Sequence, residues 1–226
     1  MIPFAWTVVT LAVFFGARWI YLRSKSPLLH PVMWASLILI ATLEFIGHKS
    51  YGVYREQTTG MFWFLGPAVV ALAVPIYRLR AIILRNARGL VVVVVASLAF
   101  SLTSTAAVLL AFGLSRTVIE ALCLKSVTAA VAFAIAQEVH AEPFLAGVAT
   151  MVAGMLGAIG GPWIIRRLGI RDPRAAGLAI GCGSHVLGTM RAFEESEEMG
   201  TFASVAMALT ALGAALICPP LFLLFS

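Results

Sequence analysis

Long apolar runs separated by short basic loops constrain this chain more than any other feature. Of its 226 residues, 61% are hydrophobic and only 12% are Asp, Glu, Lys or Arg, and the mean hydropathy is +0.99. A soluble domain carries about 25% charged residues, so these values exclude a soluble globular protein. The runs are continuous and do not alternate, which argues against a transmembrane β-barrel. We expect an all-α membrane protein.

A membrane-spanning helix needs about 20 apolar residues, and eight segments of this kind can be drawn. They cover residues 3–22, 31–47, 60–77, 89–113, 117–138, 143–165, 174–192 and 200–225. No low-complexity linker separates them, and the first run lacks the basic flank and cleavage site of a signal peptide. The sequence therefore predicts one transmembrane domain over 1–226, a single bundle of about seven to eight segments.

Basic loops indicate the topology, because Lys and Arg concentrate in cytoplasmic loops. The loops after the first, third and sixth segments are basic, and they contain Arg23 and Lys25, then Arg78, Arg80, Arg85 and Arg88, then Arg166, Arg167, Arg171 and Arg174. Strict alternation places the third loop opposite the other two, unless 117–138 enters and leaves by one face. The polar residues 125–128 favour such a re-entrant segment. We then expect Glu194–Glu198 and the N-terminus outside and the C-terminus in the cytoplasm.

The segment starts also hint at internal symmetry. Segments two to four begin near 31, 60 and 89, and segments six to eight near 143, 174 and 200, at offsets of 112, 114 and 111 residues. Secondary transporters are commonly built from inverted repeats, with the site where interrupted helices of the two halves meet. The sequence predicts repeats over 31–113 and 143–225, although any three helices of similar length give similar offsets.

Three of the segments contain residues that interrupt a helix. Gly66 and Pro67 can start a half-helix in the third segment, because proline suits the first helical position. Ser126 and Thr128 can cap a half-helix in the fifth, and Ser184 can do so in the glycine-rich seventh. The N-terminus of a half-helix favours an anion. We predict a substrate or ion site at these breaks; the alternative is close packing through small residues.

An ionisable residue inside a span is costly and indicates function by default. Lys125 lies in the middle of its segment, so its ammonium can bind a carboxylate beside the hydroxyls of Ser126 and Thr128. The alternatives are a lysine that reaches the membrane surface, or one that pairs with Glu120. We favour the binding role.

The seventh segment contains further candidates. His185 titrates near neutral pH and suits proton coupling, unless a backbone carbonyl simply holds it. Thr189 lies one helical turn later on the same face. Arg191 either helps to bind an anion or pairs with Glu194 or Glu195 at helical spacing.

Signals for catalysis are weak. The chain contains no H-E-x-x-H motif and no Walker loop, and its glycine-rich stretch 177–188 lacks a βαβ context. Cys123, Cys182 and Cys218 lie in apolar runs without metal-binding spacing. Ser184 and His185 are adjacent, about 100° apart on a helix, and cannot form a nucleophile and base pair on one face. We expect no enzyme, cofactor, metal or nucleic-acid partner.

Three stretches carry a resemblance to the LrgB/CidB family. They are FLGPAVVALAVPIY (64–77), LKSVTAAVAFAIAQEV (124–139) and RDPRAAGLAIGCGSHVLGTMRAFEESEEMGTFASVAMALT (171–210). The last is the most specific, because the family pattern places a His, then Gly-Thr, Arg-Ala, a Glu-rich turn and a Gly. Ala129 and Ala130 stand where the family commonly has Thr-Pro.

The resemblance implies a function and a location. Members of the family were described as holin-like partners in murein hydrolase export and autolysis, and relatives include the plastid glycolate/glycerate translocator and bacterial pyruvate transport systems. It implies an alternating-access secondary transporter of small monocarboxylates such as glycolate, glycerate, lactate or pyruvate, in the bacterial cytoplasmic (inner) membrane. The alternative is a holin-like pore or a regulator of murein hydrolase export that acts with a small LrgA/CidA-type membrane partner. We expect a homodimer.

The resemblance also implies a set of site residues, since several candidates occupy motif positions. The expected substrate-binding residues, with His185 also carrying the coupling proton, are Lys125, Ser126, Thr128, Gly66, Pro67, Ser184, His185, Thr189 and Arg191.

Overall fold

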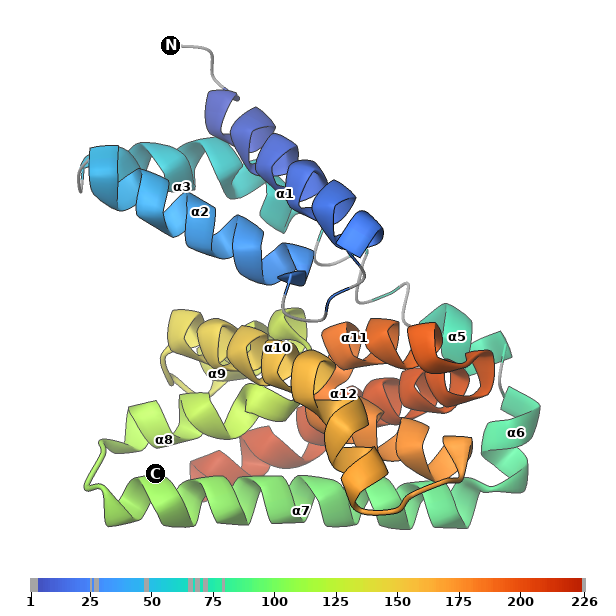
Figure 1. Cartoon of the computed structure of the whole chain (residues 1–226). Helices are drawn as coiled ribbons and strands as arrows, with labels where there is room; N and C mark the ends of the chain where they lie inside the picture. Colours follow the sequence, from blue (N-terminus) through green and yellow to red (C-terminus); the bar gives the residue numbers. More distant parts are fainter. Residues whose placement is uncertain are drawn as a thin grey trace. The chain divides into compact units, whose positions relative to one another are not determined.

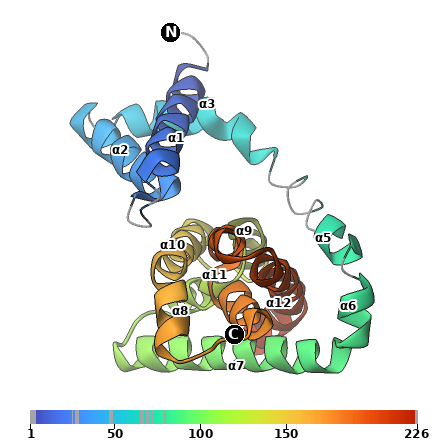
Figure 2. The same ribbon diagram turned by 45° about the vertical axis from the view of Figure 1, so that its right-hand side comes forward.

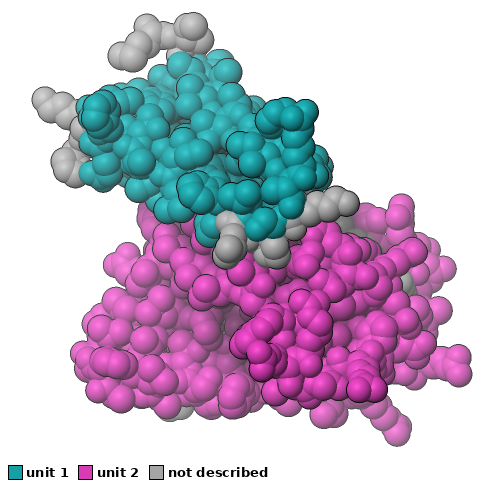
Figure 3. All heavy atoms as spheres, in the orientation of Figure 1, with its two compact units in different colours: residues 1–68 teal, residues 69–226 magenta. Residues whose placement is uncertain are grey.

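The computed structural model describes residues 4–24, 26, 29–46, 49–64, 67, 70, 73–78 and 80–224. Within these residues every regular element is a helix. Four of the helices, α1, α7, α10 and α12, are long and apolar enough to cross a membrane. The prediction of an all-α membrane protein is confirmed. The chain forms two compact units, residues 1–68 and 69–226 (Figure 3), and each is described by itself.

Unit 1 consists of α1 (Ala5–Ser24), α2 (Pro31–Ile46) and α3 (Lys49–Phe62). Most of α3 lies between two of the predicted apolar segments, 31–47 and 60–77, because this helix is polar. Its Gln57 accepts hydrogen bonds from α1, at the side-chain Oε1 from the amide N of Trp6 (3.1 Å) and at the backbone O from Thr7 Oγ1 (2.7 Å). These bonds attach α3 to α1, and hydropathy alone does not reveal this polar helix.

Unit 2 is built from long helices and two interrupted ones. In chain order its elements are α5 (Ala73–Arg78), α6 (Arg80–Arg85), α7 (Ala87–Ala111), α8 (Arg116–Cys123), the 3-10 turn η2 (Leu124–Ser126), α9 (Ala129–Glu138), α10 (Pro143–Arg167), α11 (Pro173–Glu195) and α12 (Glu197–Leu224). Pro143 and Pro173 stand in the first turns of α10 and α11, where no hydrogen bond is lost.

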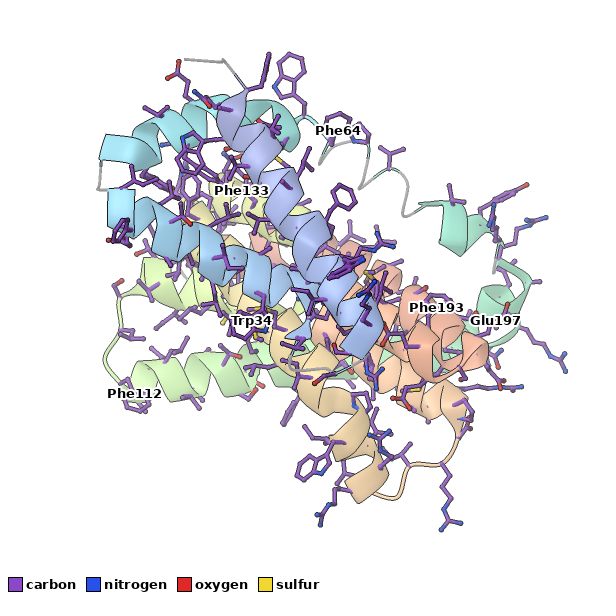
Figure 4. All side chains as sticks on the ribbon, turned by 45° about the horizontal axis from the view of Figure 1, so that its top comes forward. Trp34, Phe64, Phe112, Phe133, Phe193 and Glu197 are labelled. Atoms are coloured by element: carbon purple, nitrogen blue, oxygen red, sulfur yellow. The ribbon has the colours of Figure 1, made fainter. Side chains whose placement is uncertain are left out.

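The fifth predicted segment is a helical hairpin, which we call hairpin 1 (residues 116–138). Its two arms are α8 and α9, and η2 forms the tip. Figure 1 shows both arms opening toward the same side of unit 2, where α7 ends and α10 begins. On that side, Phe133 of α9, labelled in Figure 4, lies edge-on to Phe144 of α10, with ring centroids 5.7 Å apart. The predicted interruption near residues 125–128 is confirmed.

The seventh segment is also a hairpin, which we call hairpin 2 (residues 173–195). At His185 the backbone has φ 38° and ψ −132°, and the chain reverses. Gly188 of the second arm lies against Ile180 and Ser184 of the first. In an unbroken helix, residues 180 and 188 are about 12 Å apart. The two arms therefore pack against each other, and hairpin 2 does not cross the unit.

The two hairpins belong to a repeated pattern of one long helix followed by one hairpin. The long helices α7 and α10 each have 25 residues and begin at 87 and 143, which are 56 positions apart. Figures 1 and 2 show α7 along one edge of unit 2, and in Figure 1 α7 and α10 run in opposite directions with the hairpins entering from opposite sides. This is an inverted arrangement within 87–195. The longer repeats over 31–113 and 143–225 stay a prediction.

The reversal in hairpin 2 corrects the expected position of the acidic run Glu194–Glu198. Arg166 pairs with Glu195 at 3.2 Å and Arg174 with Glu198 at 2.7 Å, so this run lies at the same end of unit 2 as the basic loop. Figure 4 shows Glu197 on the opposite side of unit 2 from Phe112, which follows α7. The expected position of the acidic run opposite the basic loops is wrong because the seventh segment does not cross unit 2.

Candidate functional site

The tip of hairpin 1 presents an ammonium group among hydroxyls. Lys125 Nζ donates to Ser101 Oγ (3.0 Å) and to Thr105 Oγ1 (2.5 Å), both on α7. Ser126 Oγ lies 2.7 Å from the same Ser101 hydroxyl. Within the part of the chain that the structure describes, Lys125 makes no ion pair. Because an ammonium has three donors, one remains for a ligand.

The alternative that Lys125 pairs with Glu120 is wrong. Glu120 Oε1 instead accepts from Arg116 Nε at 2.6 Å, one turn earlier on α8. Arg116 Nη2 also donates to the backbone O of Phe222, at 2.5 Å. The buried carboxylate is thereby neutralised away from the tip, and the charge of Lys125 stays uncompensated.

Thr128 contributes a second open group at this tip. It occupies the N-cap position of α9, with φ −69° and ψ 148°, but its side chain makes no capping hydrogen bond. The residue is 6% exposed, and its Oγ1 is buried without a hydrogen-bond partner among the described residues. The backbone N–H groups of residues 129–131 belong to the first turn and have no intrahelical acceptor. The start of α9 thus combines first-turn N–H groups that lack an intrahelical acceptor with a Thr128 hydroxyl that makes no hydrogen bond to any described residue.

The capping roles predicted for the serines are wrong. Ser126 Oγ is held by Ser101 and caps neither η2 nor α9. In hairpin 2 the break lies at His185 rather than at a capped turn, and Ser184 Oγ has no hydrogen bond to any described residue. Contacts with neighbouring helices, and not local capping hydrogen bonds, stabilise the helix breaks in both hairpins.

The tip of hairpin 2 is fixed by the backbone of α10. His185 is 4% exposed, and its Nε2 lies 2.7 Å from Thr150 O. Because a carbonyl only accepts, Nε2 carries the hydrogen, and Nδ1 is the acceptor of the neutral ring. A positive φ at a residue other than glycine costs about 1–3 kcal/mol and persists only where the surroundings enforce it.

Thr150 joins the two tips, and the sequence analysis did not name it. Its carbonyl accepts from His185 of hairpin 2, while its Oγ1 lies 3.5 Å from Leu124 O of hairpin 1 and 2.7 Å from Ala146 O. Thr150 is 1% exposed. A buried hydroxyl in an otherwise apolar span was the signal, but it is common in membrane helices, where it bonds to the preceding turn.

Small residues let hairpin 2 approach its neighbours closely. On α10, a Cβ at Gly154 would overlap the His185 ring and one at Gly157 would overlap the Ser184 hydroxyl. On hairpin 2 itself, a Cβ at Gly181 would overlap Ala203 O of α12. Close packing through glycine, the alternative to a ligand site, therefore holds for these positions.

The remaining candidates lie away from the tips. Among the described residues, Thr189 Oγ1 contacts Met207 Sδ, at 3.8 Å. The turn at His185 removes the helical register expected between His185 and Thr189. Arg191 donates to Glu194 and Glu195, at 2.6 Å each, which agrees with the alternative that it pairs with these glutamates. It lies six residues past the turn, about 9 Å along the arm. The structure therefore does not bring Arg191 to Lys125.

The predicted break in the third segment is only partly visible. Gly66 lies outside the described residues, and Pro67 is helical and exposed.

The tip of hairpin 1 offers donors suited to a small anion. It combines the ammonium of Lys125, the hydroxyl of Thr128 and the first-turn N–H groups of α9, which favour negative charge. No group of three or more His, Cys, Asp or Glu able to hold a metal occurs in the described ranges.

Comparison with known proteins identifies the family. A sequence model described as the LrgB-like family matches residues 10–224. The chain belongs to this family. The holin-like protein CidB of Staphylococcus aureus is 31% identical over 96% of this chain and 95% of its own length, and that of Staphylococcus epidermidis is 30% identical over the same shares. The protein YxaC of Bacillus subtilis is 33% identical over 90% of this chain and 88% of its own. No solved structure matches this LrgB-like chain.

The resemblance found in the sequence is thereby confirmed for almost the whole chain. Together with the apolar helices, it shows that this LrgB-like protein is a bacterial membrane protein.

Proposed function

We propose that this LrgB-like protein is a secondary transporter of small monocarboxylates, of the glycolate, glycerate, lactate or pyruvate class. The observation that carries the proposal is the meeting of two opposed hairpin tips beside the half-buried cation of Lys125, which makes no ion pair with any described residue. Interrupted helices that meet near the midplane form the substrate sites of secondary transporters. Inverted elements of this kind give two equivalent states that open to opposite sides.

The substrate carboxylate binds at the tip of hairpin 1. Lys125 supplies the charge, Thr128 Oγ1 and the first-turn N–H groups of α9 supply hydrogen bonds, and Ser126 orders the surrounding hydroxyls. Ser101 and Thr105, both hydrogen-bonded to Lys125, hold the ammonium when no substrate is present. An unpaired cation inside a membrane protein is costly even when it is half-buried, so the bound anion lowers the free energy of the occluded state.

His185 and Ser184 form the opposite wall, and His185 takes the coupling proton at Nδ1. The bond to Thr150 O keeps the ring in place while its charge changes. Thr150 also lies beside Leu124 O of hairpin 1. Substrate binding at the tip of hairpin 1 is therefore transmitted through Thr150 to the tip of hairpin 2. Thr189 and Arg191 support the second arm of hairpin 2 rather than the substrate.

The basic loops face the cytoplasm in this proposal, and the N-terminus lies outside. Residues at the starts of α7 and α11 line one cleft, which supports placing their loops on one side. Since hairpin 2 returns to that side and α12 crosses once, the C-terminus then lies outside rather than in the cytoplasm.

Counterflow in proteoliposomes tests the transport function. Vesicles loaded with unlabelled glycolate or pyruvate should accumulate the labelled substrate transiently and saturably, with and without a pH gradient. Lys125→Ala should abolish the accumulation, and Arg167→Ala, which removes an exposed cation, should leave it intact. Preserved transport by a folded Lys125→Ala protein would refute the assignment; a monodisperse elution profile establishes folding.

A second candidate rests on the relatives named holin-like protein CidB. In that case the chain forms a pore, or regulates murein hydrolase export, together with a small LrgA/CidA-type membrane protein. Non-saturable dye leakage from the same vesicles would favour the pore. Activity that appears only when the small protein is added would establish the partner, and cross-linking would show whether the chain forms a homodimer.

A further inference from the structure

A cleft at the basic end of unit 2 lies outside the site described above. It has a volume of about 820 Å³ and lies between the start of α7, the start of α11 and Phe202 of α12. Arg85, Arg88 and Arg174 bring positive charge to it, and its wall includes the exposed Leu84 and the partly exposed Val93 and Leu178. The cleft is therefore cationic on one part and apolar on the other.

The charge of the cleft is only partly balanced. Arg174 Nε pairs with Glu198 at 2.7 Å, whereas Arg85 and Arg88 make no ion pair within the described residues. Asp172 is the one acidic residue in the lining, and its carboxylate accepts from the backbone N of Arg174 at 2.8 Å. Two exposed guanidinium groups thus remain for an anion.

The start of α7 adds to this potential. Its N-cap residue Asn86 makes no capping bond, because its side-chain amide donates to Ile82 O at 3.0 Å. The first-turn N–H groups and the positive end of a 25-residue helix therefore face the cleft region uncapped.

The depth of the cleft identifies the chemistry of its occupant. Ala87 begins a helix long and apolar enough to cross a membrane, so Arg85 and Arg88 lie at the level of the lipid headgroups. The apolar residues of the wall continue along α7 toward the membrane interior. Basic pockets between membrane helices bind anionic lipid headgroups.

We propose that this cleft binds an anionic phospholipid, with its phosphate on Arg85, Arg88 and the start of α7, and its acyl chain along the partly exposed Val93 and Leu178. A free phosphate would satisfy the guanidinium groups but leave the apolar wall uncovered, which favours the lipid. The bound lipid joins α7 to the open end of hairpin 2. This inference does not depend on the transported substrate.

Thermal unfolding of the full-length protein in a neutral detergent tests the inference. Phosphatidylglycerol should raise the melting temperature more than phosphatidylcholine with the same acyl chains, and native mass spectrometry should retain the anionic lipid preferentially. In the double variant Arg85→Gln/Arg88→Gln we expect an affinity about 30-fold weaker, because each cation near the headgroups contributes about 1 kcal/mol. Arg167→Gln/Arg171→Gln removes the same charge outside the cleft and should bind like the unmodified chain.

Each alternative outcome contradicts the proposal in a distinct way. Equal rises in melting temperature with the two lipids would show that the cleft does not distinguish lipids by headgroup charge. An equal loss in the control pair would show that only net charge matters. A shift produced by inorganic phosphate alone, at the concentration of the lipid, would assign the cleft to a soluble anion. If the first variant is unstable, Arg88→Lys, which keeps the charge, should retain most of the lipid preference.

Discussion

Hairpin 1 and hairpin 2 both reverse the chain within unit 2, but different contacts stabilise their tips. Hairpin 1 turns through the three residues of η2 and an extended Thr128, and hydroxyls of α7 surround its tip. Hairpin 2 turns at the single residue His185, and glycines of α10 let its tip pack tightly. Unwound backbone inside a membrane must be satisfied by protein or water. One tip therefore keeps spare polar groups, and the other is locked by packing.

The comparison assigns different tasks to the two tips. In the proposed transporter, hairpin 1 binds the substrate through its uncompensated cation and its unbonded buried hydroxyl. Hairpin 2, which packs closely on α10 and α12, positions one imidazole, and we propose that it transmits movement through Thr150. Three substitutions test this division, from the largest expected effect on stability to the smallest.

The largest effect is expected at Gly157 of α10. Gly157→Ala places a methyl group where the Ser184 hydroxyl lies, so hairpin 2 must shift. Overpacking of a tight core costs typically about 1–3 kcal/mol, and we expect a loss near the upper end of that range. Equilibrium unfolding in mixed micelles measures it.

The matched control for Gly157 is Gly160 on the same helix. A Cβ there meets only Ile164 Cδ1, at 4.0 Å, so Gly160→Ala should be neutral or stabilising. Equal stability of the two alanine variants would show that hairpin 2 is not locked by close packing.

An intermediate effect is expected at the turn of hairpin 2. His185→Gly and His185→Ala both lose the bond to Thr150, but only glycine accepts φ 38° without strain. We therefore expect the glycine variant to be more stable than the alanine variant by about 1 kcal/mol. Differential scanning fluorimetry compares the two melting temperatures.

The order should reverse at Met190, an exposed helical residue of the second arm. There glycine should be less stable than alanine by about 1 kcal/mol. Alanine superior to glycine at both positions would contradict the strained turn.

The smallest effect on stability is expected at the tip of hairpin 1. Thr128→Val removes a hydroxyl that has no partner among the described residues, so stability should stay the same or rise. If this hydroxyl binds substrate, the KM for carboxylate counterflow should rise about tenfold, the cost of one lost hydrogen bond to a charged group.

Thr103→Val is the comparison for Thr128. Thr103 Oγ1 bonds only within α7, to Ala99 O at 2.7 Å and Phe100 O at 3.3 Å, so this change should leave KM unaltered. A destabilised Thr128→Val protein with normal KM would mean that Thr128 serves the fold and not the ligand.

Much of the molecule was predictable from the sequence. The apolar runs predicted an all-α membrane protein, and the starts at Pro143 and Pro173 agree with the predicted segments to within one residue. The polar residues 125–128 marked the tip of hairpin 1. These features were predictable because the transfer free energy of a helix depends on its composition, and helix interruption depends on a few local residue types.

Other features were decided only by the tertiary structure. Sequence reasoning placed a helix break near Ser184 in the glycine-rich segment 174–192, next to the observed turn at His185. It still read the segment as crossing, because the reversal at His185 is imposed by contacts with α10. The pairing of Arg191 with Glu194 and Glu195 was one of two open readings until the structure showed it.

The sequence by itself determined the membrane fold, the positions of the long helices and the polar character of the first tip. Only the tertiary structure decided that two hairpins meet, that Thr150 connects them, and that the acidic run lies with the basic loops. The physical reason is that hydropathy and capping act along the chain, over a few residues. A hydrogen bond such as His185 to Thr150 joins residues 35 positions apart, and it exists only once the helices have packed.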